Sequence, residues 1–196
     1  MAISTLGVSL TLAVAATGLP ARGPLADLAR GFSAFRAGDY HESARALDGL
    51  PQKLPRNRDY ALYLLGESLF YDGAYARARA AFSELAKLRP SRFAGVAAWR
   101  GADCQWMQGQ HGEAAATYQR LLGEKTPGTD PAVARFHLAE FSAERAAQAG
   151  AAEARRLFLQ VHLDFPAHPL AAEAVKRAAE LGAVAAPEAA VLSPRE

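Results

Sequence analysis

Few residues of this 196-residue chain have the types and spacing that could support chemistry. Five histidines are scattered at positions 41, 111, 137, 162 and 168, and none forms the i, i+4 pair or carboxylate cluster that a metal site needs. The single thiol, Cys104, allows no intrachain disulfide, and a helix between Ala102 and Trp106 would make it a small buried hydrophobe. We therefore predict no catalytic residue, no metal and no cofactor.

The elements that carry these residues follow a repeated order. From Tyr60 to Pro90, a small residue (Gly66), a turn glycine (Gly73), then Tyr75, Ala78, Phe82 and Pro90 match the tetratricopeptide pattern of two antiparallel helices around a tight turn. Gly66 lets the two helices approach, Phe82 fills the gap beside Ala78, and Pro90 is expected to end the second helix.

Further copies of this order surround the first. Gly31, Gly38, Tyr40, Ser43, Leu47 and Pro55 form one upstream, with Gly38 and Gly73 separated by 35 residues; Ala102, Gly109, His111, Ala114, Tyr118 and Pro127 form one downstream. A fourth, looser copy has Ala154, Phe158 and Pro166, after a helix over residues 133–148 that looks a few residues too long. The Asp130-Pro131 pair is a good helix start. The sequence predicts an all-α, right-handed solenoid of about four antiparallel hairpins plus a C-terminal helix.

The binding surface of such an array is expected on the first helix of each hairpin, which lines the concave side. The outward positions hold Phe32, Phe35 and Arg36 in the first hairpin, Tyr60, Tyr63, Glu67 and Tyr71 in the second, and Trp99, Asp103 and Trp106 in the third. The candidate binding groove is Tyr60, Tyr63, Glu67, Tyr71, Trp99, Asp103 and Trp106, with Trp99 and Tyr63 as the expected exposed pair. Aromatic rings suit sugar C–H surfaces or extended peptides, although any one ring could instead pack between repeats.

Composition and charge agree with a scaffold. Hydrophobic residues make up 51% of the chain and charged residues 21%, and much of the apolar share is alanine, which lets helices stack closely. The formal net charge is +2, and no Lys/Arg block with interleaved aromatics is present. We therefore predict no nucleic-acid partner.

Three segments are predicted. Residues 1–20 are apolar and resemble a secretory signal, with Ala13-Val14-Ala15 as a cleavage triplet; a buried first helix or an uncleaved anchor are the alternatives. Residues 21–182 form the helical array, whose last helix, from His168 to Leu181, is expected to stop at Gly182. Residues 183–196 are an Ala/Pro linker, and Ser193-Pro194-Arg195-Glu196 has the pattern of a helix start, which indicates a fragment of a longer protein.

Beyond the generic repeat, the run from Leu157 to Ala174 and the linker after it resemble the amino-terminal superhelical region of soluble lytic transglycosylases. The resemblance implies a periplasmic array that precedes a lysozyme-like domain cleaving peptidoglycan glycan strands. In that family the catalytic Glu lies in a Glu-Ser motif of the later domain, whereas Glu67-Ser68 is followed by a repeat turn, so Glu67 is not expected to be catalytic.

Two functions follow as expectations. One is a non-catalytic, periplasmic binding module that positions a glycan strand for a transglycosylase domain. The other is a protein–protein adaptor in envelope assembly or cell-division coordination, whose groove takes a peptide or helix. In both, the mature chain has no integral membrane span.

Overall fold

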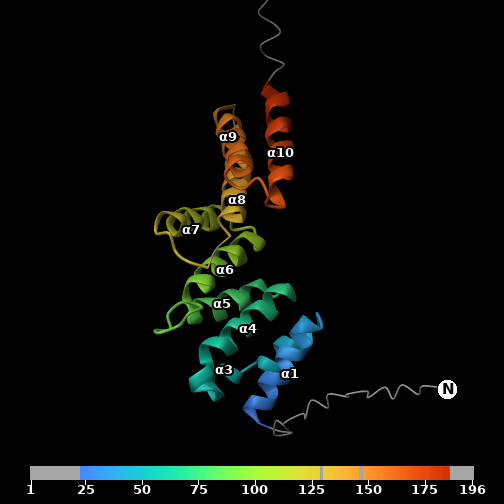
Figure 1. Cartoon of the computed structure of the whole chain (residues 1–196), viewed down its shortest axis with the longest axis vertical. Coiled ribbons are helices and arrows are strands. Elements are labelled where there is room, and N and C mark those ends of the chain that lie inside the picture. The colour runs from blue at the N-terminus through green and yellow to red at the C-terminus, as the bar shows by residue number, and fades with distance from the viewer. Residues whose placement is uncertain (1–22, 129, 146–147, 186–196) are drawn as a thin grey trace, which may run out of the picture.

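The computed structural model of the chain describes residues 23–128, 130–145 and 148–185, and every regular element in these ranges is helical. The helices form four consecutive hairpins and a final single helix, stacked along the long axis of the molecule from α1 to α10 (Figure 1). The bounds are α1 Pro24–Arg36, α2 Tyr40–Leu47, α3 Leu50–Lys53, the 3-10 turn Pro55–Asn57, α4 Arg58–Tyr71, α5 Tyr75–Leu85, α6 Ala94–Met107, α7 His111–Gly123, α8 Pro131–Glu144, α9 Gln148–Asp164 and α10 Leu170–Ala185. The predicted all-α solenoid is confirmed.

The first three hairpins turn at the predicted glycines. Gly38, Gly73 and Gly109 have φ angles of 79°, 79° and 75°, a left-handed conformation that glycine adopts without steric cost. In the second turn the amide of Ala74 donates to the carbonyl of Leu69, which closes the end of α4. The repeat spacing therefore located these turns correctly.

The small residue of each hairpin lies where its two helices cross. A Cβ atom added to Gly31 would lie 2.6 Å from Leu47 Cγ, and one added to Gly66 would lie 2.6 Å from Phe82 Cε1. Leu47 and Phe82 are both fully buried, so neither can move aside cheaply. The predicted role of these glycines in helix approach is confirmed.

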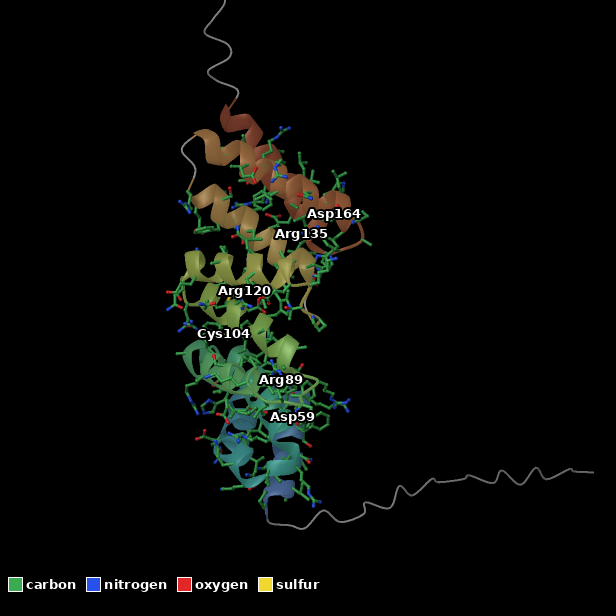
Figure 2. The ribbon with its side chains drawn as sticks, turned by 90° about the vertical axis from the view of Figure 1, so that its left-hand side faces the viewer. Asp59, Arg89, Cys104, Arg120, Arg135 and Asp164 are labelled. Carbon is green, nitrogen blue, oxygen red and sulfur yellow. The ribbon has the colours of Figure 1, made fainter. Side chains whose placement is uncertain are left out.

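The hairpins bury their apolar faces on one another. One core cluster joins the first two hairpins to Ala97 and Cys104 of α6, a second lies between α6, α7 and α8, and a third between α8, α9 and α10. Cys104 lies in the middle of the molecule (Figure 2) and is fully buried, as predicted for a structural thiol. Each cluster spans a junction between repeats, so the array gains its stability by stacking.

Several helix ends differ from the prediction. Helix α5 ends at Leu85, where the Ala86 amide donates to the Phe82 carbonyl and the Lys87 amide to the Glu84 carbonyl, so Pro90 lies in the following loop and does not end the helix. The second helix of the first hairpin is split into α2 and α3 by Gly49, whose φ is 65°. Helix α10 runs through Gly182 to Ala185, and the predicted stop at Gly182 was wrong. A Cβ atom added to Gly182 would lie 3.3 Å from Nε of Arg155, an exposed and flexible side chain of α9.

The fourth hairpin is also more regular than predicted. Asp130 caps α8 by accepting a hydrogen bond from the Ala132 amide, which confirms the predicted start. Helix α8 has 14 residues, the same as α4 and α6, so it is not overlong. The extra length lies in α9, which has 17 residues and buries Ala154 and Phe158 completely.

The whole predicted leader, residues 1–20, and residues 186–196 of the predicted linker lie outside the described residues; residues 183–185 belong to α10. Within the described part, none of the helices has the length and hydropathy needed to cross a bilayer.

Candidate functional site

Exposed apolar side chains gather on one set of helices. We call the surface formed by the first helix of each hairpin, together with α10, the inner face; its helices are α1, α4, α6, α8 and α10. The exposed large hydrophobic residues of the described chain are Leu25 and Phe32 on α1, Tyr71 on α4, Met107 on α6, Val175 on α10 and Leu163 on α9. All but Leu163 lie on inner-face helices, so five of the six exposed large hydrophobic residues of the described chain are found there.

The seven residues predicted to form the groove all lie on α4 and α6, but they differ in exposure. Tyr71 is 53% exposed, whereas Trp99 is 3% and Glu67 6% exposed. The others, Tyr60, Tyr63, Asp103 and Trp106, are half-buried. The expectation that Trp99 is exposed was wrong, Tyr63 is half-buried, and Glu67 does not face water. The role of the seven residues in binding stays a prediction.

Trp99 is buried because the loop between α7 and α8 folds over the start of α6. The Thr126 carbonyl accepts a hydrogen bond of 3.2 Å from Trp99 Nε1. A Cβ atom on Gly95 would lie 2.4 Å from the Pro127 carbonyl oxygen, and one on Gly128 2.5 Å from Val96 Cγ2, so loop and helix are in close contact. The residue spacing within one repeat could not predict that Trp99 is covered, since the covering loop connects the third hairpin to the fourth.

A buried ion-pair network links α4 to α6. Arg100 donates two hydrogen bonds to Glu67, of 2.8 and 2.7 Å, and a third, of 3.0 Å, to Asp103. Its guanidinium also lies 3.9 Å from the centre of the Phe70 ring. Burial alone would lower the pKa of Arg100, but the hydrogen bonds and negative charge of Glu67, with Asp103, raise it above its ordinary value.

The network continues to α8 through aromatic rings. Tyr118 donates a hydrogen bond of 2.8 Å to Asp103, and burial together with the Asp103 charge raises the pKa of this hydroxyl, so it stays protonated. Its ring stacks on that of His137, which bonds to Glu140 at 3.0 Å. We call the contiguous set Glu67, Arg100, Asp103, Tyr118, His137 and Glu140 the polar ladder.

Trp106 extends the ladder toward the turn of the fourth hairpin. Its ring lies 4.1 Å from that of His111 and 4.2 Å from that of His137, measured between centroids. His111 in turn bonds to Glu144 at 2.8 Å. Trp106 therefore packs between repeats, one of the alternatives that the sequence left open.

Two aromatic stacks flank the ladder, one at the junction of the first and second hairpins and one at the junction of the second and third. Tyr71 stacks on Tyr40 with centroids 4.9 Å apart, and Tyr63 stacks on Phe93 at 4.7 Å. Burial, followed by the charge of Glu67, raises the pKa of Tyr63. The stacks hold both phenol rings in fixed orientations, and Tyr71 remains half-exposed.

A cavity of about 240 Å³ opens between α6, α8 and the loop that precedes α8. Its lining includes Trp99, Arg100, Asp103, Tyr118, Asp130 and Val133. Asp130 bonds to His168 at 3.0 Å. No cluster of three or more metal-ligating side chains occurs in the part of the chain that the structure describes.

Sequence reasoning missed Arg100, Tyr118, His137 and Met107 as members of this surface. The sequence could have predicted a role for Arg100, because it precedes Asp103 by three residues, about one helical turn, on the helix face proposed to contact ligand. Tyr118 was assigned only to helix packing, and its hydroxyl contact depends on how consecutive hairpins align.

The geometry agrees with comparisons to known proteins. A tetratricopeptide-repeat family model matches residues 60–91 and 97–124. MamA from Desulfovibrio magneticus RS-1, solved from residue 41 to its end, is 21% identical with a TM-score of 0.55, covering 82% of this chain and 96% of that one. A MamA RS-1 double mutant is similar, with 21% identity, a TM-score of 0.55 and coverage of 83% and 96%.

A putative kinesin light chain from Podosopora anserina with nearly identical TPR-like repeats has 14% identity, a TM-score of 0.60 and coverage of 82% of this chain and 86% of its own. The search of curated proteins found no match. Residues 60–91 and 97–124 are therefore tetratricopeptide repeats, and the described helices form a tetratricopeptide-type solenoid.

Proposed function

We propose that this chain is a non-catalytic binding module whose inner face takes a segment of a partner protein. The observation that carries the proposal is the placement of Leu25, Phe32, Tyr71, Met107 and Val175, exposed apolar side chains that all lie on inner-face helices. Solenoids use such extended surfaces for recognition, and amphipathic or extended peptides bind through rows of apolar anchors.

A selection from a library of random displayed peptides, about twelve residues long, tests the proposal. We expect the purified chain to enrich peptides that also bind in solution. The variant Tyr71→Ser/Met107→Ser should lose this binding by at least about tenfold, because it removes two anchors. Leu163→Ser is the matched control, since Leu163 is 75% exposed but lies on α9. Failure to enrich any peptide, or equal losses in both variants, would contradict the proposal.

A second candidate ligand is a peptidoglycan glycan strand, and Tyr71 is the observation that favours it. This ring is held by its stack on Tyr40 and is half-exposed, as a ring that packs on a sugar C–H face must be. In this version the array orients a strand for a transglycosylase domain elsewhere in a longer protein. A pull-down on purified peptidoglycan with the wild-type chain, Tyr71→Ala and Leu163→Ala tests this candidate. Loss of binding in Tyr71→Ala alone supports the glycan strand as the ligand, and retained binding in both variants excludes it. Release of anhydro-muropeptides by the purified chain would refute a non-catalytic role.

The proposed location is the bacterial periplasm. Its support is the apolar, uncharged run of residues 2–19, followed by Pro20, Gly23 and Pro24. Fractionation of cells with N-terminal sequencing of the recovered protein tests this: a start shortly after Ala15 in the periplasmic fraction is expected. An intact Met1 in the membrane fraction would support the anchored alternative, and an intact cytoplasmic chain would overturn both.

A further inference from the structure

Carboxylates outnumber fixed cations along the inner face of α4, α6 and α8. Five carboxylates lie on or beside the polar ladder, namely Glu67, Asp103, Asp130, Glu140 and Glu144. Among the described residues, Arg100 is the only arginine or lysine within ion-pairing distance of any of them. It neutralises one of the two carboxylates that it contacts.

The remaining partners of these carboxylates are histidines. His168 pairs with Asp130, His137 with Glu140 and His111 with Glu144. Five carboxylates, from α4 to the end of α8, thus have one arginine and three histidines as their ion-pair partners.

The neighbouring arginine on α8 does not restore the balance. Arg135 is paired with Asp164 of α9. Figure 2 shows the two side chains close together in the C-terminal part of the molecule, away from Cys104 at its centre. The whole chain nevertheless has a formal net charge of +2. The excess of carboxylates on α4, α6 and α8 is therefore local to these three helices, and it is opposite in sign to the net charge of the chain.

The exposed carboxylates are accessible to a ligand. The side chains of Asp130 and Glu144 are 50% and 47% exposed, and Asp103 and Asp130 both line the cavity of about 240 Å³ beside the rings of Trp99 and Tyr118. Arg100 also lines the cavity, but its guanidinium is already paired with Glu67 and Asp103. A cationic group with an apolar stem suits the cavity, because the rings can contact the stem while the exposed Asp130 carboxylate accepts hydrogen bonds from the head. Tyr71 and Met107 supply exposed apolar contacts on the adjoining helix ends.

We propose that the inner face of α4, α6 and α8 binds a basic, amphipathic segment of a partner protein, whose lysine or arginine side chains pair with Asp103, Asp130, Glu140 and Glu144. This inference rests on the proposed function as a protein-binding module and adds the chemistry of the partner. An acidic segment would meet uncompensated negative charge, which opposes its approach at low salt.

The test starts from the peptides enriched in the selection described above. The expected result is an excess of Lys and Arg over Asp and Glu in the enriched set, compared with the unselected library. For the tightest peptide, synthetic versions with every Lys and Arg replaced by Gln should bind at least about tenfold more weakly at about 50 mM salt. The difference should shrink as salt is raised, because screening weakens exposed charge pairs.

Matched variants locate the charges. The inner triple variant Asp130→Asn/Glu140→Gln/Glu144→Gln keeps the helix cap and the hydrogen bonds to histidine while it removes three charges. The outer triple variant Asp48→Asn/Glu153→Gln/Asp164→Asn removes the same number from the junction of α2 with α3 and from α9. In wild type the basic peptide should bind at least about tenfold more tightly than its Gln-substituted version. We expect this ratio to fall below about threefold in the inner variant and to stay unchanged in the outer variant.

The outcomes separate the two proposals. Enriched peptides that are neutral or acidic, or an equal response of the inner and outer variants, overturn the basic partner and leave the protein-binding module standing. A library from which nothing is enriched overturns both.

Discussion

Arg100 on α6 holds Glu67 on α4 through two parallel hydrogen bonds, although the two residues are 33 positions apart and belong to successive repeats. Only 8% of the Glu67 side chain is exposed, so its charge depends on this one guanidinium. The pair fixes the alignment of two inner-face helices and sets the position of Asp103 beside them.

Replacing Arg100 by Met should therefore destabilise the chain strongly. The variant leaves the Glu67 carboxylate buried without its cation, and breaking a buried pair in this way costs about 3 kcal/mol. Urea denaturation followed by circular dichroism measures the loss. Arg45→Met is the control: Arg45 pairs with Glu42 on the surface, where such a pair contributes less than about 1 kcal/mol. Similar costs in the two variants would contradict the structural importance assigned to the Glu67–Arg100 pair.

Replacing two helical glycines by alanine should change stability in opposite directions, because Gly66 lies at the crossing of α4 and α5 whereas Gly101 of α6 faces open space. Gly66→Ala should destabilise by about 1 to 3 kcal/mol, because the added Cβ meets the fully buried Phe82 ring. Gly101, within α6, has no atom within 4 Å of the equivalent position, so Gly101→Ala should stabilise by up to about 1 kcal/mol through helix propensity. Thermal unfolding of both variants checks the signs, and a stabilised Gly66→Ala protein would refute the close approach.

Stability should fall at alkaline pH, in part because of Cys104. Burial raises the pKa of this thiol to about 12, whereas an unfolded thiol ionises near about 8.5. Between these values the unfolded chain loses a proton that the folded chain keeps, so the unfolded state binds fewer protons and the free energy of unfolding decreases as pH rises.

The comparison of wild type with Cys104→Ala isolates this contribution. The cavity left by the substitution lowers stability at every pH, but the decrease from about pH 8 to about pH 10 should be smaller in the variant. Denaturant titrations of both proteins at the two pH values give the decrease in the free energy of unfolding for each. An equally steep decrease in the variant would mean that the thiol ionises in the folded chain as it does in the unfolded one.

The hairpins could be predicted from sequence because their determinants are local. Gly31, Gly66 and the turn glycines at 38, 73 and 109 act within one repeat, so their spacing reports both the turn and the crossing. The exposure of the groove could not be predicted in the same way. Trp99 is covered by the loop at 126–128, and Glu67 finds its partner in the next repeat, so both depend on how hairpins dock.

The last helix shows the limit of reading helix ends from residue type. Glycine commonly ends a helix, but Gly182 lies inside α10, which continues to Ala185. The same residue type forms a turn at Gly73 and a close helix crossing at Gly66. Only the surrounding contacts distinguish these roles.

Binding of a protein segment to the inner face is tested most directly by the solution affinity of an enriched peptide for the wild-type chain, for Tyr71→Ser/Met107→Ser and for Leu163→Ser. We expect a loss of at least about tenfold in the inner-face variant and an unchanged affinity in the α9 control. An unchanged affinity in the inner-face variant, or a loss confined to Leu163→Ser, would contradict binding to the inner face.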